Sequence, residues 1–159
     1  KLAEWGRQPL PISAASHDGD CLHLRLEGGE GSVSAAHQRF GGEVIDDQYW
    51  TALNEHQLAF FDEGLPLWRL SLPNHTGPLT LPGAQLIDWA GAQRWLKTEA
   101  DTVQALAHEV GGHATCYRQG ASDTPFQPLA PALLRYHRQL KAQLDPLGLF
   151  NPGRMYPEF

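Results

Sequence analysis

The residues best suited to chemistry lie in the C-terminal tail, in the sequence Asn-Pro-Gly-Arg at residues 151–154. The ring of Pro152 restricts the backbone and Gly153 permits a tight turn, so the guanidinium group of Arg154 is held at a defined point. A guanidinium group binds planar anions such as carboxylates through paired hydrogen bonds. Asn151 and Arg154 are therefore the best candidates in the sequence for contact with a ligand. The alternative is that Arg154 pairs with a carboxylate across a domain interface and only anchors the chain terminus.

A second group of polar and aromatic residues lies on strand-like segments in the middle of the chain. Its members are Arg69, Asp88, Trp89, Arg94 and Trp95. Because side chains alternate along a strand, Asp88 is expected to point away from Trp89, and Arg94 away from Trp95. A sheet face that carries arginine and aspartate can line the roof of a substrate cavity, which makes Arg69 and Arg94 substrate-side candidates. The alternative is a surface ion pair backed by two buried tryptophans.

Two histidines, His108 and His113, flank Glu109 and a pair of glycines. The metalloprotease motif needs histidines four positions apart on one face of a helix, whereas these are five positions apart. Gly111-Gly112 also ends the helix between them. The sequence therefore predicts no metal site here. His113 is expected to begin a strand as a partly buried residue, with a substrate-side role as the alternative.

The other candidate ligands form no recognisable metal or redox motif. Residues 17–20, His-Asp-Gly-Asp, contain an imidazole and two carboxylates but have the composition of a turn. Cys21 and Cys116 lie far apart and outside any CxxC arrangement. Both are predicted to be buried thiols.

The composition is typical of a single globular domain. The chain has 159 residues and a formal net charge of -6, with no cluster of lysine or arginine that would attract nucleic acid. No apolar stretch is long enough to span a bilayer, and the first residues do not have the basic region followed by an apolar region of a signal peptide. Both observations favour a cytoplasmic, soluble protein. The start at Lys1, without Met, suggests a processed product or a piece of a longer polypeptide.

Two halves of the chain have the same expected order of elements. The first half predicts a hairpin from residues 12–16 and 22–26, a helix that ends at Gly41-Gly42, and a strand over residues 43–45. The second predicts strands at 86–89 and 93–97, a helix at 99–110 and a strand at 113–118. A constant shift brings the apolar positions of one helix onto those of the other; these are Val33, Ala36 and Phe40 against Val103, Leu106 and Val110.

Three further elements complete the expected fold. A strand is expected around Trp68, Leu70 and Leu72, and a short helix at 46–57 is expected to bury Trp50 and Leu53. Residues 73–82 are expected to form a loop, and a last helix should run over residues 130–144. The fold class predicted is α+β: a duplicated ferredoxin-like antiparallel sheet with helices packed on one face.

Four sequence blocks carry a resemblance to a known family. They are Pro-Leu-Trp-Arg-Leu-Ser-Leu-Pro at 66–73, Leu-Ile-Asp-Trp-Ala-Gly-Ala-Gln-Arg-Trp at 86–95, Gly-Gly-His-Ala-Thr at 111–115, and the tail with its Asp-Pro turn and Asn-Pro-Gly-Arg corner. The chain resembles the flavin-linked oxidases of the vanillyl-alcohol-oxidase and p-cresol-methylhydroxylase type. Within them, it is most similar to the FAD-binding subunits of bacterial glycolate oxidases, over nearly its whole length.

This resemblance implies that residues 1–159 are a C-terminal cap or substrate domain, which folds over a flavin held by a separate N-terminal domain. The glycine-rich loops and the covalent attachment position of that flavin domain have no counterpart in the chain. We therefore expect FAD in the full-length subunit, and a fragment that is inactive and does not retain it. Asn151 and Arg154 then become cofactor-contact candidates, and Arg69, Arg94 and His113 remain on the substrate side.

The resemblance also implies an activity and a set of partners. The whole enzyme would oxidise glycolate, a 2-hydroxy acid, to glyoxylate and pass electrons through flavin to an iron–sulfur subunit. A sister flavoprotein subunit would belong to the same complex, which would associate with the inner membrane. One rival hypothesis is a non-enzymatic ferredoxin-like module that binds a partner chain or small effector. The other is a metal hydrolase using His108 and His113.

Overall fold

The structure is a computed structural model that describes residues 1–62, 64–118 and 122–159. Within these ranges the strands form one six-stranded antiparallel sheet in the order β2-β1-β4-β5-β3-β6. The strands are β1 (Ile12–His17), β2 (Leu22–Leu26), β3 (Leu67–Ser71), β4 (Ala84–Asp88), β5 (Gln93–Lys97) and β6 (His113–Cys116). The helices are α1 (Leu2–Trp5), α2 (Glu30–Phe40), α3 (Gln48–Asn54), α4 (Val103–Glu109) and α5 (Pro131–Leu144), with short 3-10 helices η1 (Ala59–Phe61) and η2 (Trp89–Gly91).

The central strands β3 and β5 carry apolar side chains on both faces of the sheet. On β3, Leu67 belongs to one core cluster and Trp68 to the other, because neighbouring residues of a strand point to opposite faces. Helix α4 covers one face through Val103 and Ala107. Helix α3 and η1 cover the other face. The removal of both apolar faces from water makes this part the stable body of the molecule.

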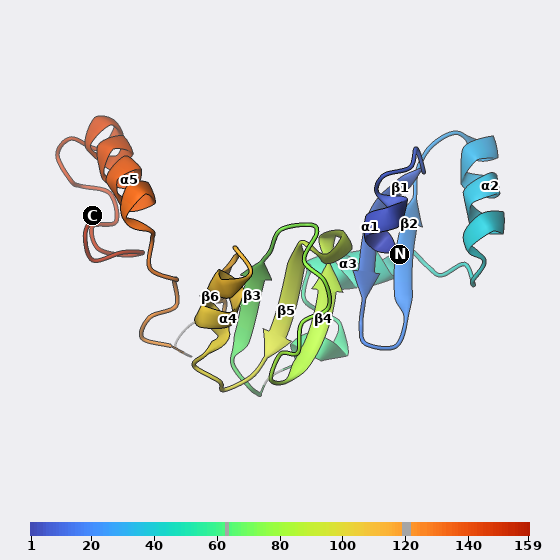
Figure 1. Cartoon of the computed structure of the whole chain (residues 1–159), viewed down its shortest axis with the longest axis horizontal. Helices are drawn as coiled ribbons and strands as arrows, with labels where there is room; N and C mark the ends of the chain where they lie inside the picture. Colours follow the sequence, from blue (N-terminus) through green and yellow to red (C-terminus); the bar gives the residue numbers. More distant parts are fainter. Residues whose placement is uncertain (63, 119–121) are drawn as a thin grey trace.

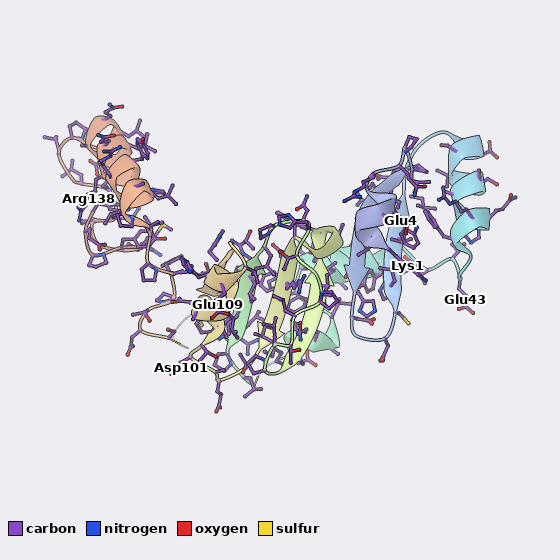
Figure 2. The ribbon with its side chains drawn as sticks, in the orientation of Figure 1. Lys1, Glu4, Glu43, Asp101, Glu109 and Arg138 are labelled. Atoms are coloured by element: carbon purple, nitrogen blue, oxygen red, sulfur yellow. The ribbon has the colours of Figure 1, made fainter. Side chains whose placement is uncertain are left out.

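Helices α2 and α5 lie at opposite ends of this body (Figure 1). Figure 2 shows the same separation, with Arg138 on α5 at one end and Glu43, just after α2, at the other. Helix α5 begins with a proline at its first position, which fixes the backbone without losing a helical hydrogen bond. It has no buried residue. Among the described residues, no helix combines the length and apolar character needed to cross a membrane.

Most of the elements follow the sequence prediction. The hairpin, the helix that ends at Gly41, the loop at 73–82 and the last helix are present, and α3 buries Trp50 and Leu53. The α+β class with an antiparallel sheet is confirmed. The helices, however, are divided between the two faces instead of covering one. The reason is that β3 and β5 are apolar on both sides and need cover on both.

The repeat predicted for the two halves is incomplete. Residues 43–45 form no strand, and the Val44 side chain is 85% exposed. Helix α2 buries Ala36 alone and does not cover the centre of the sheet as α4 does, and the segment after it shares a pocket with β2 without pairing with that strand. Within the described residues, β2 is therefore an edge strand without a partner on its outer side.

Two single-residue predictions are also wrong. Trp89 is 69% exposed instead of buried, because β4 ends at Asp88 and the chain turns away through η2, with a φ of 49° at Trp89. Cys21 is exposed because it directly follows the turn between β1 and β2, whereas Cys116 is buried as predicted. Burial raises the pKa of the Cys116 thiol above its usual value.

The turn after α4 brings the backbone of β6 very close to the end of β3. Gly111 has a φ of 78° and ends the helix, as the sequence predicts. At Gly112, an added Cβ would stand 2.5 Å from the carbonyl oxygen of Ser71 and 2.6 Å from the Leu72 side chain. Glycine is therefore required at position 112 by the close approach of two strands.

We predict that Gly112→Ala destabilises the chain by about 1–3 kcal/mol, because the new methyl group meets backbone that cannot move freely. The matched control is Gly31→Ala in α2, where nothing lies within 4 Å of the added Cβ. That substitution should leave stability unchanged or raise it by up to about 1 kcal/mol. Urea unfolding of both variants gives the comparison, and equal stability of the two would contradict the predicted steric clash.

Candidate functional site

On the α3 side of the sheet, a row of polar residues extends toward β6. In the register of β3 and β6, Arg69 stands opposite Thr115 and Ser71 opposite His113. Directly opposite residues of antiparallel strands point to the same face. These side chains therefore share a face with Trp95, the partner of Arg69 on β5. Two of the predicted substrate-side residues, Arg69 and His113, are thus brought onto one surface.

An aromatic cluster borders Arg69 on this face. The rings of His56 and Phe61 stack with centroids 4.2 Å apart, and Trp95 meets Tyr117 edge-on at 5.0 Å. The guanidinium carbon of Arg69 lies 5.9 Å from the centre of the Tyr117 ring, a cation–π distance. The ion pairs found among the described residues do not include Arg69. Within the described part of the chain, the guanidinium group therefore contacts an aromatic ring and no carboxylate.

The sequence prediction missed His56 and Tyr117. Tyr117 continues the alternation of His113 and Thr115, so its face was foreseeable from the strand period. His56 gave no such signal, because it follows α3 in a left-handed conformation with a φ of 55°. Burial among the rings lowers the pKa of the His56 imidazole below its usual value, an effect that the nearby Glu55 carboxylate partly opposes. His56 is therefore disposed to stay neutral.

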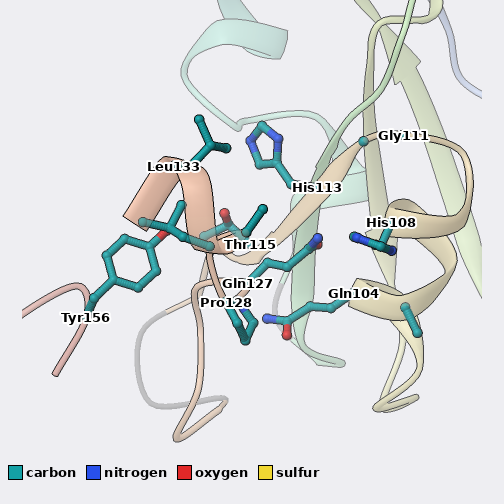
Figure 3. Close-up of a pocket in the computed structure, with 13 residues that line it drawn as sticks. Gln104, His108, Gly111, His113, Thr115, Gln127, Pro128, Leu133 and Tyr156 are labelled. Carbon is teal, nitrogen blue, oxygen red and sulfur yellow. The ribbon is translucent and has the colours of Figure 1, made fainter. Parts of the chain in front are cut away.

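A cavity of about 700 Å³ lies between α4, β6 and the start of α5. Figure 3 shows its lining, with Gln104 and His108 on α4, His113 on β6, and Tyr156 from the C-terminal tail. The described residues that line it include no carboxylate, lysine or arginine. The cavity thus has a mixed polar and apolar lining, and it lies where the body of the molecule meets the C-terminal segment.

His113 begins β6 as predicted, but its side chain is exposed instead of partly buried. His108 lines the same cavity from the end of α4. Among residues 1–62, 64–118 and 122–159, no group of three or more histidine, cysteine or acidic side chains is placed to hold a metal ion. The geometry gives the metal-hydrolase hypothesis no support.

Residues 17–20 form the predicted turn. The Asp18 carboxylate accepts hydrogen bonds from the backbone N–H groups of Asp20 at 3.0 Å and Cys21 at 2.8 Å. Gly19 adopts a φ of 114°, which suits the turn. The carboxylate of Asp18 is thus used within the turn itself.

Arg94 lies on the opposite face of the sheet from Arg69. The structure separates it from Trp95, as alternation predicts, but places it in the core at 3% exposure. Its Nη2 donates to the carbonyl oxygens of Thr76 at 2.9 Å and Gly77 at 2.8 Å. The arginine therefore holds the loop of residues 73–82 against the sheet. This arrangement favours a structural role for Arg94 over a substrate-side one.

The surface ion pair offered as an alternative for Asp88 and Arg94 is absent from the described contacts. Asp88 is 7% exposed, accepts a hydrogen bond from the Trp89 N–H at 2.8 Å, and another from the Gln93 side chain at 3.3 Å. Burial is the largest influence on this carboxyl group and raises its pKa above the usual value, although both hydrogen bonds act against that shift. Asp88 therefore holds the start of the η2 turn.

The C-terminal tail is ordered around the carboxylate of Asp145. This residue is 8% exposed, and its oxygens accept from the Lys141 ammonium at 2.6 Å, the Leu149 N–H at 2.9 Å and the Phe150 N–H at 2.9 Å. The hydrogen bond from Lys141 is the largest of the effects that lower the pKa of Asp145 to about 2. Lys141 also donates to the carbonyl oxygen of Phe150. We call this set of contacts, made by Lys141, Asp145, Leu149 and Phe150, the Asp145 clasp.

Asn151 and Arg154 form a corner directly after the clasp. Asn151 has a φ of 46°, the Arg154 N–H donates to the Asn151 carbonyl at 3.2 Å, and both side chains are exposed. They border a pocket of about 440 Å³ with aromatic walls that include Phe126 and Phe159. An apolar pocket with a cation and an amide at its rim fits one edge of a flat aromatic group such as a flavin ring.

The surface around the tail is strongly apolar. The stripe of α5 faces solvent, and so do several residues that follow the helix. Exposed fractions are 51% for Leu133, 57% for Tyr136, 56% for Leu140, 74% for Leu144, 78% for Leu147, 68% for Leu149 and 67% for Phe150. A contiguous apolar surface of this kind marks an interaction site. The apolar side chains of α5 and of residues 147–150 are thus left largely open to solvent.

We predict that acidification lowers the stability of the chain in part through His56. Because the folded state disfavours the charged imidazole, the unfolded chain binds more protons, and stability falls as the pH drops below about 6.5. His56→Phe should therefore show a weaker loss of thermal stability between about pH 8 and pH 5. His75→Phe, at an exposed position of the 73–82 loop, is the matched control and should keep the full dependence. If the melting temperatures of the two variants fell equally between these pH values, this role of His56 would be ruled out.

Comparison with known proteins identifies a relative of the chain. The chain is 53% identical over 160 aligned residues to the glycolate oxidase subunit GlcE of Escherichia coli (strain K12), and the match covers 99% of the chain. The chain spans 45% of that relative, its C-terminal part. No protein-family model and no solved structure matches the chain. On this identity, the chain belongs to the family of the glycolate oxidase subunit GlcE and corresponds to the C-terminal part of such a subunit.

Proposed function

We propose that these residues are the C-terminal cap of a glycolate oxidase subunit that carries FAD on the remaining part of its chain. The observation that carries the proposal is the 53% identity with a glycolate oxidase subunit over 99% of the chain. The chain has no glycine-rich phosphate loop, so the nucleotide part of FAD would be held outside it. The cap would cover the flavin and exclude water from it.

The exposed surface of α5 and the tail supports the cap over the non-enzymatic module. A module that binds a partner through its sheet would be expected to bury its tail on its own body. Instead, Leu144 and Leu147 are 74% and 78% exposed. Such a surface is suited to pack against a neighbouring domain of the same polypeptide.

The proposed reaction is the oxidation of glycolate to glyoxylate, in which the 2-hydroxy acid loses two electrons and two protons. FAD, when bound, supplies the acceptor for the hydride equivalent. Arg69 is the residue of this chain proposed to hold the substrate carboxylate, because its guanidinium group is ordered over Tyr117 and makes no ion pair among the described residues. His113, on the same face, would contact the substrate side. No residue of this chain is assigned as the catalytic base.

The proposal extends to assembly and location. The relative is named as a subunit, which supports a complex of several chains. The partners proposed are a sister flavoprotein and an iron–sulfur subunit that passes the electrons onward. The location proposed is the cytoplasm, at the inner membrane through the complex, with no role in nucleic-acid binding because the net charge is -6.

The first test is the visible spectrum of the full-length protein beside that of residues 1–159. We expect a yellow full-length protein whose flavin absorbance is bleached by glycolate when no electron acceptor is present, and a colourless fragment. A full-length protein without flavin would refute the proposed cofactor. A fragment that retains flavin would show that the boundary between the two parts is misplaced.

The second test concerns Arg69 in the full-length, FAD-loaded protein. Arg69→Met should raise the KM for glycolate by about tenfold to a hundredfold, as expected for the loss of charge-assisted hydrogen bonds worth about 1.5–3 kcal/mol. The matched control is Arg39→Met, which removes an exposed arginine of α2. An unchanged KM in Arg69→Met would remove this residue from the substrate site while leaving the cap proposal intact.

A further inference from the structure

The segment that joins α5 to the Asn151–Arg154 corner is held in place without hydrophobic burial. Every residue from 146 to 155 is exposed. Asp145 is the buried exception at the start of this segment, at 8% exposure. Because these residues bury little apolar surface, the conformation of the turn depends mainly on hydrogen bonds. The Asp145 clasp supplies them.

Both oxygens of the Asp145 carboxylate are engaged. Oδ1 accepts from the Leu149 N–H, whereas Oδ2 accepts from the Phe150 N–H and from the Lys141 ammonium. The backbone of Asp145 adds two bonds, since its N–H donates to the Lys141 carbonyl at 2.8 Å and its carbonyl accepts from the Gly148 N–H at 3.0 Å. One side chain thus ties the last turn of α5 to the residue that precedes Asn151.

The corner continues directly from the clasp. Lys141 also donates to the carbonyl oxygen of Phe150, so both polar groups of the Phe150 backbone are fixed. The next residue, Asn151, takes a left-handed φ of 46°, and Gly153 follows with a φ of 66°. The Gly153 N–H then donates to the carbonyl of Phe159 at 2.9 Å, which closes the corner. The backbone path that leads to Arg154 therefore depends on the fixed position of the Phe150 backbone.

We propose that Asp145 is a positioning residue for the flavin site. By holding Lys141 and the amides of Leu149 and Phe150, it fixes where the Asn151 amide and the Arg154 guanidinium group meet the edge of the flavin. This inference rests on the proposed function, because it requires a flavin beside the corner. Lys141 is held by Asp145 and also lines the pocket that the corner borders.

The physical effect to measure is the flavin midpoint potential. A cation near the flavin edge stabilises the negative charge of the reduced flavin, so removing that cation or displacing it lowers the midpoint potential. A residue that only stabilised the fold would lower the melting temperature and leave the potential unchanged. The potential therefore separates positioning from stability.

The experiment uses the full-length, FAD-loaded protein and four variants: Asp145→Asn, Arg154→Gln, the double variant, and Asp20→Asn as a matched control. Asp20 is exposed in the turn between β1 and β2, so its substitution removes the same charge away from the tail. We expect Arg154→Gln and Asp145→Asn each to shift the midpoint potential to more negative values. The double variant should show the shift of Arg154→Gln alone and not the sum, because the two residues act through one contact. Asp20→Asn should match the unmodified protein.

Each outcome decides between the inference and the proposed function. If Arg154→Gln shifts the potential and Asp145→Asn does not, the clasp is merely structural and the inference is overturned, while the proposed function stands. If the two shifts add in the double variant, Asp145 acts independently of Arg154, which also overturns the inference. If neither single variant shifts the potential while the protein still holds flavin, Arg154 does not contact the flavin edge. That result removes the cofactor role of the corner and the positioning role together.

Discussion

The constraint that organises the body of the molecule is the two-sided apolar character of β3 and β5. On β3, the neighbours Leu67 and Trp68 belong to different core clusters. On β5, the same is true of Trp95 and Leu96. Each face must therefore be covered by a separate element. Helix α4 and the loop held by Arg94 cover one face, and α3 with η1 covers the other. The polar row at Arg69 lies on the same sheet as these buried residues, so a rigid scaffold positions it.

Local patterns predicted the elements well, because strand alternation and helical periodicity depend on neighbouring residues. The helices that end at Gly41 and Leu144 and the strand at Leu70 follow directly from such patterns. The segment after α2 could not be predicted in this way. Residues 43–45 have strand-forming composition, but a strand needs an edge against which to pair. Whether residues 43–45 find such an edge depends on how α2 packs, and the packing of α2 cannot be predicted from the local sequence.

The site was predicted in part for the same reason. Proline and glycine around Asn151 indicate a rigid corner, and the structure shows one. The role of Asp145 was not foreseen, because before a proline it is expected to end a helix, and its contacts with Leu149 and Phe150 arise only after the turn is formed. Arg94 was assigned the wrong surroundings because the path of the 73–82 loop is not encoded in the strand pattern. Arg69 and His113 share a face because of register, which alternation alone does not fix.

The open side of β2 has a consequence for how this polypeptide behaves in isolation. Its backbone N–H and C=O groups on that side have no strand beside them within the described ranges, and the nearby Val44 and Ile45 are 85% and 48% exposed. An edge strand whose outer N–H and C=O groups are unpaired, next to exposed apolar side chains, is a template on which another strand can pair. An edge strand with these features is of the kind expected to favour strand addition in an isolated chain, and it lies at the end of the molecule opposite α5.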